Sequence, residues 1–155
     1  MNLEDRLKRC RLEFGDRQWD IIIFAETWRQ EAREAWELEE GHHWFGSGGS
    51  ARSCGVGVLL NKRWVHTLFR PLSNRLAILD VKISSLGVLR CAAVYMPHVE
   101  RPDEEVDVVY AQLEDQTREA SRKCITTIIV GDFNAQVGPH SEFDDDQIVG
   151  NNSMP

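Results

Sequence analysis

Two kinds of hydrophobic spacing along the chain predict its helices and strands. Apolar residues recur every three or four positions over 3–14 and again over 106–120, which is the spacing of one face of an amphipathic helix. Asn2 is a suitable N-cap for the first of these helices. Thr27 and Gln30 have the spacing of a capping box and predict a further helix that ends at Gly41. The apolar positions that mark the first two helices are Leu3, Leu7, Cys10 and Phe14, then Val106, Val109, Tyr110, Leu113, Thr117 and Ala120.

Short apolar runs predict the strands. The Ser-Ser-Leu-Gly segment that precedes Val88 is typical of a hairpin turn, and residues 46–55 and 131–150 predict loops. The resulting order is helix, strand, helix, several strands, helix and strand, which predicts an α/β fold with at least one helix-covered sheet. The predicted strands are residues 20–25, 55–61, 75–83, 88–95 and 124–130.

Charge narrows the functional classes. The chain has 155 residues, a length typical of one domain, and a formal net charge of −7. Residues 101–155 hold 4 Lys and Arg against 12 Asp and Glu, and no basic stripe typical of nucleic-acid-binding domains is present. Non-specific nucleic-acid binding is therefore disfavoured. Nuclease chemistry is not excluded, because a divalent cation can supply positive charge at the reacting phosphate.

Location and redox state follow from the same composition. No apolar run approaches the roughly 18 residues of a membrane span, and the charged N-terminus lacks the apolar region of a signal peptide. The four cysteines are widely scattered and form no CxxC pair, so we expect them to be reduced and mostly buried. We expect an intracellular protein, nuclear or cytoplasmic, that is neither secreted nor bound to a membrane.

Polar side chains follow three of the predicted strands. Glu26 comes directly after the first strand, Tyr95 closes the fourth, and Asp132 with Asn134 follows the last. Each taken alone is most often a solvated loop residue, a rim residue or a turn residue. If the strands are near neighbours, however, two carboxylates, a phenol and an amide meet at one rim. Carboxylate oxygens suit Mg²⁺, and the other groups suit phosphodiester hydrolysis.

Four segments occur in an order that resembles a known family. They are "IIIFAETW", "GVGVLLNKRW", "AAVYMP" and "IIVGDFNAQVG". Together they resemble successive motifs of the endonuclease/exonuclease/phosphatase superfamily, over about residues 15–150. The segments "ETWR", "GVGVLLNKRW" and "YMPH" are most similar to LINE-type retrotransposon endonuclease domains, which are AP-endonuclease-like, and to craniofacial-development-protein-like relatives. The resemblance implies a four-layer α/β sandwich.

The resemblance also implies a role for each candidate residue. Glu26 matches a metal-binding Glu, and Tyr95 matches a Tyr that contacts the scissile phosphate. Asp132 matches the Asp that orients or deprotonates the attacking water beside the metal, and Asn134 an Asn that steadies the transition state. His98 is a further candidate for substrate contact. The implied cofactor is Mg²⁺ or Mn²⁺, the implied substrate is DNA, and the implied partner is a reverse-transcriptase domain in a longer parent polyprotein.

The chain matches only the N-terminal portion of the superfamily pattern. Residues 1–150 correspond to a partial domain and residues 151–155 to a truncated tail, while the first strand and the C-terminal part have no counterpart. An Asn, an Asp and a His of the catalytic set are unmatched, so we expect little or no turnover. An incomplete sandwich should also leave an apolar sheet face exposed, with poor solubility or dimerisation as the result.

Two other functions stay open, and several side chains have simpler expected roles. The chain could be a non-catalytic interaction module with the same fold, or a phosphatase acting on a lipid or nucleotide phosphate. Alternation along an extended segment predicts that Phe133 packs inward. Arg75 is expected to be solvated or ion-paired, and His42 and His43 are expected to lie in a surface loop.

Overall fold

The computed structural model describes residues 3–14, 18–49, 54–83 and 87–135. Within them the chain forms two helices and eight strands. In chain order these are α1 (Leu3–Phe14), β1 (Ile21–Ala25), β2 (Glu34–Glu37), β3 (His43–Ser47), β4 (Val56–Leu60), β5 (Val65–Ser73), β6 (Leu76–Ile83), β7 (Gly87–Tyr95), α2 (Asp103–Arg122) and β8 (Thr126–Asp132).

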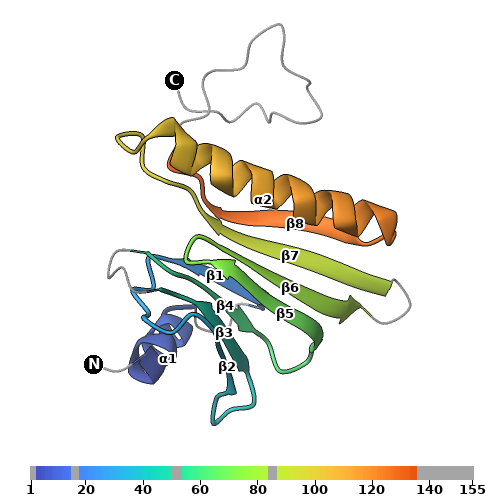
Figure 1. Ribbon diagram of the computed structural model, residues 1–155. Helices are drawn as coiled ribbons and strands as arrows, with labels where there is room; N and C mark the ends of the chain where they lie inside the picture. The colour runs from blue at the N-terminus through green and yellow to red at the C-terminus, as the bar shows by residue number, and fades with distance from the viewer. Residues whose placement is uncertain (1–2, 15–17, 50–53, 84–86, 136–155) are drawn as a thin grey trace, which may run out of the picture.

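The two sheets lie face to face, and one helix lies on the outer side of each (Figure 1). The first sheet has the order β1-β4-β3-β2 and the second β5-β6-β7-β8. All described strand pairs are antiparallel except β7 and β8, which are parallel and joined by α2. Leu7 of α1 packs on the outer face of the first sheet, and Val109 and Leu113 of α2 pack on that of the second. The fold is therefore the predicted four-layer α/β sandwich.

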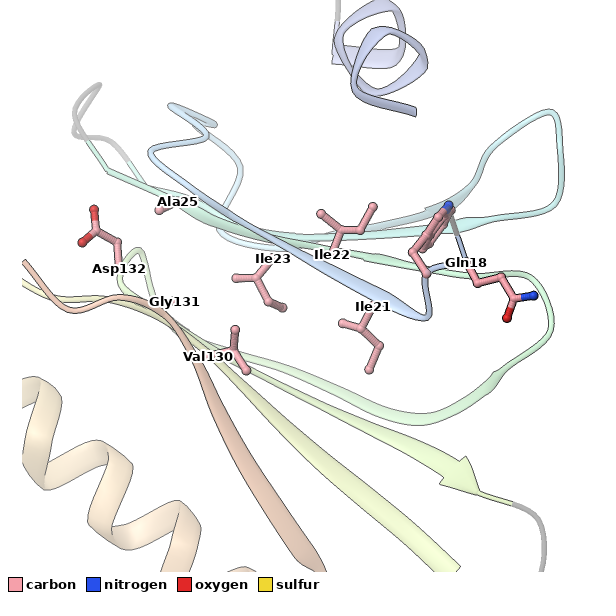
Figure 2. Close-up of a pocket in the computed structure, with 9 residues that line it drawn as sticks. Gln18, Ile21, Ile22, Ile23, Ala25, Val130, Gly131 and Asp132 are labelled. Carbon is pink, nitrogen blue, oxygen red and sulfur yellow. The ribbon is translucent and has the colours of Figure 1, made fainter. Parts of the chain in front are cut away.

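One side of the sandwich is open between the edge strands β1 and β8. An open groove of about 560 Å³ lies there, and Figure 2 shows Val130 of β8 facing Ile21 and Ile23 of β1 across it. Asp132 and Ala25 line the same groove at its far end. The groove thus leads to the ends of both edge strands, where Glu26 and Asp132 are located.

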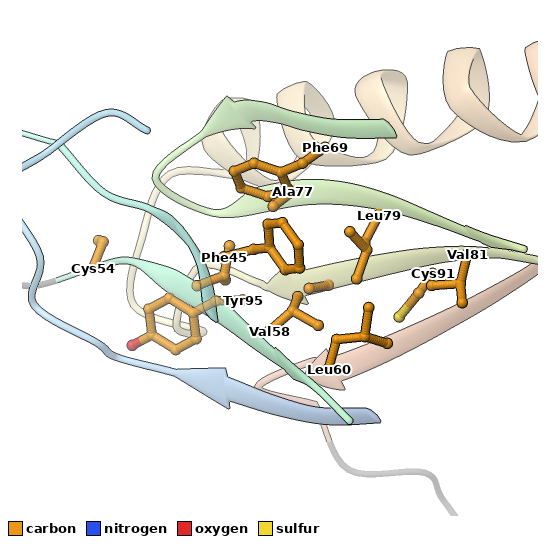
Figure 3. Close-up of a cluster of buried hydrophobic side chains, with 12 residues drawn as sticks. Phe45, Cys54, Val58, Leu60, Phe69, Ala77, Leu79, Val81, Cys91 and Tyr95 are labelled. Carbon is orange, nitrogen blue, oxygen red and sulfur yellow. The ribbon is translucent and has the colours of Figure 1, made fainter. Parts of the chain in front are cut away.

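The main core fills the space between the two sheets (Figure 3). Alternate residues of β4 and β6 point into it, which is the period-two pattern of a strand with two buried faces. The other residues of the same strands face the helices, so the apolar runs are continuous in the sequence. The buried members of this core include Phe45, Val56, Val58, Leu60, Phe69, Ala77, Leu79, Val81, Cys91, Ala93 and Tyr95.

The helices predicted over 3–14 and 106–120 and the five predicted strands are confirmed within a few residues. The helix predicted from Thr27 to Gly41 is wrong, because that stretch holds an extended loop and β2. Residues 46–47 belong to β3 rather than to the predicted loop, while residues 50–53 and the loop beyond Ala135 lie outside the described residues. Asn2, the expected N-cap, also lies outside them.

Other expectations about burial are only partly met. The four cysteines lie in the described residues and form no disulfide there; Cys54 and Cys91 are buried, but Cys124 is exposed. The expected exposed apolar sheet surface is concentrated, in the described part of the chain, on the edge strand β8, where Ile128, Ile129 and Val130 are 38–41% exposed. The central strands β4, β6 and β7 are packed on both faces. Neither described helix has the length and apolar composition needed to cross a membrane.

Candidate active site

Glu26 and Tyr95 meet across the two sheets. Glu26 follows β1 of the first sheet, and Tyr95 is the last residue of β7 in the second. The Tyr95 hydroxyl donates a hydrogen bond of 2.8 Å to Oε1 of Glu26. Tyr95 is 9% exposed, whereas Glu26 is exposed to solvent. The second carboxylate oxygen of Glu26 therefore has no described protein partner that would keep it from a ligand.

Asp132 lies beside Tyr95 because β7 and β8 are parallel. The two residues are direct register partners at the carboxyl ends of their strands. The backbone also joins these ends, since the Met96 N–H donates to the Asp132 carbonyl at 2.8 Å. Parallel strands place both carboxyl ends at one edge of a sheet, so the sequence pattern and the topology agree here.

The glycine before Asp132 is required by the close approach of β7. A Cβ on Gly131 would lie 1.8 Å from the carbonyl oxygen of Val94. No side chain fits at that distance, so only glycine lets β8 lie against β7 at this point. Gly131 thus brings Asp132 to the level of Tyr95.

Asn134 closes a turn that also joins it to the site. Its backbone N–H donates to Oδ1 of Asp132 at 2.9 Å, and its side-chain Nδ2 donates to the Met96 carbonyl at 2.7 Å. The Asp132–Asn134 pair is therefore an Asx turn. The turn leaves Oδ2 of Asp132 outside this bonding. It also holds the Asn134 amide beside the end of β7.

The electrostatics of Tyr95 reflect this crowding. Burial raises the pKa of the Tyr95 phenol, and the hydrogen bond to the Glu26 carboxylate raises it further. The Asn134 amide acts on that pKa in the opposite direction. Tyr95 therefore keeps its proton at neutral pH and acts as a hydrogen-bond donor.

Backbone strain is concentrated at the same place. Four described residues other than glycine have positive φ, and three of them are Glu26 (53°), Trp28 (55°) and Asn134 (47°). Such conformations cost of order 1 kcal/mol or more each and are typical of functional sites. The fourth, Cys124, follows α2 and lies away from these strand ends.

The strained loop after Glu26 replaces the predicted helix. The Thr27 and Trp28 N–H groups donate to the carbonyls of Gly55 and Cys54, so they are not part of a helical first turn. The Thr27 hydroxyl is buried without a partner in the described structure, which is the opposite of a capping box. A Cβ on Gly55 would lie 2.3 Å from that hydroxyl. Long-range backbone pairing therefore overrides the local helix signal.

A buried ion pair holds the far end of this loop. Glu34 is 5% exposed, and both of its carboxylate oxygens accept from Nε of Arg29, at 2.8 and 2.9 Å. Trp44 Nε1 donates to Glu34 Oε2 at 3.3 Å. The loop from Glu26 to Glu34 is therefore fixed at both ends. Sequence reasoning missed this pair because it assigned the stretch to a helix.

Arg75 contacts the site in a way that the sequence did not predict. Its guanidinium lies over the Tyr95 ring at 5.3 Å, and its side chain is 13% exposed. Nη2 lies 3.5 Å from Glu105 Oε2, so the expectation that Arg75 is ion-paired is confirmed. Its place directly before β6, the strand next to β7, is the signal that could have suggested contact with Tyr95.

The donor set fits a hard cation such as Mg²⁺ that keeps several waters. Glu26, hydrogen-bonded to Tyr95, and Asp132, the register partner of Tyr95, offer two carboxylates at two strand ends. Magnesium commonly uses one or two carboxylates and completes its octahedron with water and substrate oxygens. In the part of the chain that the structure describes, no three His, Cys, Asp or Glu residues gather in one group. A closed metal cage from these residues is therefore not part of the site.

Two other sequence expectations concern residues near the site. His98 is exposed, and no described contact joins its imidazole to Glu26, Tyr95 or Asp132, so its role in substrate binding stays a prediction. Phe133 is 39% exposed, and the expectation that it packs inward is wrong. The Asx turn redirects the chain after Asp132, so strand alternation no longer applies there.

The expectation that His42 and His43 lie in a surface loop is only partly met. His42 lies in the loop between β2 and β3, but it is 8% exposed, and its ring contacts that of Trp19 in a tilted arrangement with 4.8 Å between centroids. His43 opens β3 and lies 5.6 Å from the ring of His66 on β5. His43 therefore lies in β3, a strand that the sequence did not predict, whereas His42 lies in the loop just before it.

A four-layer sandwich with carboxylate, phenol and amide groups at facing strand ends defines a class of nuclease- and phosphatase-type hydrolases. The chain belongs to the endonuclease/exonuclease/phosphatase family, whose model matches residues 2–147. A comparison with curated proteins finds no match to this chain.

Proposed function

We propose that the chain carries the site of a metal-dependent phosphodiesterase, with DNA as the substrate. The observation that carries the proposal is the Glu26–Tyr95 hydrogen bond of 2.8 Å across the sheets, with Asp132 opposite Tyr95 in register. Membership of a family of nucleases and phosphatases supports the same class of reaction. Mg²⁺ or Mn²⁺ is the proposed cofactor, because the oxygen donors suit it.

Each side chain has a role that its contacts allow. Tyr95 keeps its proton, and its hydroxyl can turn from Glu26 to donate to a phosphate oxygen. Oδ2 of Asp132 takes no part in the Asx turn and can accept the proton of an attacking water. Asn134 can donate to the developing charge once its Nδ2 leaves the Met96 carbonyl. When bound, the metal ion supplies positive charge that offsets the charge developing on the phosphate.

We further propose that the activity is DNA nicking of the retrotransposon type. The support is the resemblance of "ETWR", "GVGVLLNKRW" and "YMPH" to LINE-type endonuclease domains, and a reverse-transcriptase domain in a longer polyprotein is the partner that this origin implies. We expect slow turnover, because no described imidazole or third carboxylate joins the cluster to protonate the leaving group.

Asp132→Asn tests the proposed base without removing the turn. The asparagine oxygen can still accept from the Asn134 N–H, so the fold around Gly131 should persist, while the proton acceptor is lost. We expect nicking of supercoiled plasmid in Mg²⁺ to fall by about 10²–10⁴-fold. Glu39→Gln is the matched control, because Glu39 is an exposed acid paired with Lys8 of α1.

Cleavage that survives in EDTA, or that is equal in wild type and Asp132→Asn, would contradict the proposal. A chain that binds no Mg²⁺ by titration calorimetry and cuts no plasmid, with Glu26→Gln changing nothing, would instead support the interaction module. Phosphate release from a phosphoinositide or nucleotide without plasmid nicking would support the phosphatase.

A further inference from the structure

The four sheet edges of the sandwich differ in how they are protected. Natural proteins guard exposed edges with charge, proline, bulges or short strands. The β2 edge has only four residues and carries Glu34 and Glu37. The β5 edge carries Arg70 and Pro71, and its pairing with β6 is shifted at two irregularities. Both edges on this side are therefore protected against further strand pairing.

The two edge strands on the opposite side contain no proline and no described bulge, and their one charged residue, Asp132, is the last residue of β8. The β1 strand is Ile-Ile-Ile-Phe-Ala, and β8 is Thr-Thr-Ile-Ile-Val-Gly-Asp. The described pairing of β8 is regular and involves β7 alone. In residues 126–131 no charge and no proline interrupts the strand. Such an edge is a template for another strand.

The side chains of β8 are exposed although they are apolar. Ile128, Ile129 and Val130 are 38%, 40% and 41% exposed. Their register partners on the neighbouring strand β7 are fully buried. Ile128 and Val130 share a face with Cys91 and Ala93, so they point toward the space between the sheets. Ile129 points to the opposite face, on the side of α2.

The groove between β8 and β1 continues this apolar surface. Figure 2 shows Val130 turned into the groove opposite Ile21 and Ile23. Its volume is about 560 Å³, and its lining contains one charged residue, Asp132, at one end. A partner for this side must therefore bring an extended strand with small apolar, uncharged side chains.

We propose that the partner is a second copy of the chain, with β8 pairing antiparallel to β8 of the other copy. Seven residues centred on Ile129 are self-complementary in this arrangement: Ile128 faces Val130, Thr127 faces Gly131 and Thr126 faces Asp132. Opposite residues in an antiparallel pair share a face, so apolar side chains meet apolar side chains on both faces.

Charge selects this orientation over a parallel one. Parallel pairing would bring the Asp132 carboxylates of the two copies together, and like charges directly opposite destabilise a sheet. Antiparallel pairing sets each Asp132 against a neutral threonine, about 20 Å from its counterpart at 3.4 Å per residue. The two-fold axis joins the second sheets of the two copies into one continuous sheet across an isologous interface. The site at Glu26 and Tyr95 is not needed for this assembly.

A disulfide trap tests the register without introducing a charge. In a Cys124→Ser background, Ile129→Cys places the two new thiols opposite each other, and mild oxidation should yield a covalent dimer. Thr126→Cys in the same background is the matched control, because its thiols lie about 20 Å apart and should not cross-link. Equal cross-linking of the two variants would overturn the proposed pairing.

Sedimentation provides a second measurement that depends on the fold as a whole. The full chain at tens of micromolar should sediment at twice its 17.8 kDa mass. Ile129→Lys should sediment as a monomer with an unchanged far-ultraviolet circular dichroism spectrum. Val65→Lys, on the protected β5 edge where Val65 is 64% exposed, should stay dimeric.

A wild-type monomer at every concentration would overturn the proposal. Polydisperse aggregation would overturn it as well, because an isologous pair closes on itself. If Ile129→Lys fails to fold, the cysteine pair still decides the question.

Discussion

Gly131→Ala is the substitution that best tests how β8 positions Asp132. The new Cβ would lie 1.8 Å from the Val94 carbonyl oxygen, whereas carbon–oxygen contacts are ordinarily about 3.3 Å. The obstructing atom is backbone of the central strand β7, so no side-chain rotation relieves the clash. β8 must therefore move from β7 by about 1.5 Å over the residues next to Asp132.

The cost can be worked out from what that movement breaks. Overpacking of this kind costs about 1–3 kcal/mol, and each ladder hydrogen bond lost adds about 1 kcal/mol. With one or two such bonds lost, we expect the free energy of unfolding to fall by about 2–4 kcal/mol. The displacement also separates Asp132 from Tyr95, its register partner, so any nicking activity should fall with it.

Urea unfolding followed by circular dichroism measures this change. Gly87→Ala is the matched control, because Gly87 has a φ of 91° but nothing within 4 Å of an added Cβ. It should cost only the conformational penalty of about 1 kcal/mol. If Gly131→Ala loses less than Gly87→Ala, the steric explanation of the glycine before Asp132 is wrong.

Three other predictions follow from buried or coupled groups. Arg90 and Asp80 form a buried bidentate ion pair at 2.8 and 2.9 Å under α2. Arg90→Met alone should lower the free energy of unfolding by about 3–5 kcal/mol, because it leaves the Asp80 carboxylate buried without its partner. The double variant with Asp80→Leu should recover most of that loss in urea unfolding. Partial desolvation of the His66 ring beside Phe45, aided by the proximity of His43, lowers the pKa of His66 although the residue is exposed. A small part of the stability should therefore be present above about pH 6.5 and be lost as the pH drops below it, and His66→Gln should flatten that dependence in unfolding curves. Glu34→Gln should weaken binding of Mg²⁺ in calorimetry because the loop after Glu26 loosens, and unchanged affinity would contradict this.

The strands and helices that the sequence predicted share one property. Their hydrophobic pattern is continuous and long enough to identify them, as in the apolar runs of β4, β6 and β7 and the amphipathic face of α2. The three missed strands, β2, β3 and β5, lack it. β2 is Glu-Ala-Trp-Glu, and β5 contains a proline and two register shifts, which are features of edge strands and weaken the local signal. β3 is a central strand, but its sequence is His-Trp-Phe-Gly-Ser, so its apolar run is only two residues long and ends in residues typical of loops.

The helix predicted after Thr27 failed for a related reason. A capping box is a local pattern, and it competes with partners that lie far along the chain. Here the Thr27 and Trp28 N–H groups pair with residues 55 and 54, and Arg29 binds Glu34. Several long-range contacts stabilise the extended loop more than one local cap could stabilise a helix.

The sequence by itself determined that an acid, a phenol and an Asp-x-Asn pair would each follow a buried strand, because strand ends are readable from local patterns. It did not determine that Glu26 and Tyr95 would come from different sheets. Only the tertiary structure decided that, because the packing of one sheet on the other brings together residues that lie far apart in the chain. Glu26 and Tyr95, which share a hydrogen bond, are 69 positions apart. The same distant contacts leave β1 and β8 as open edges on one side, a property that no single segment of sequence carries.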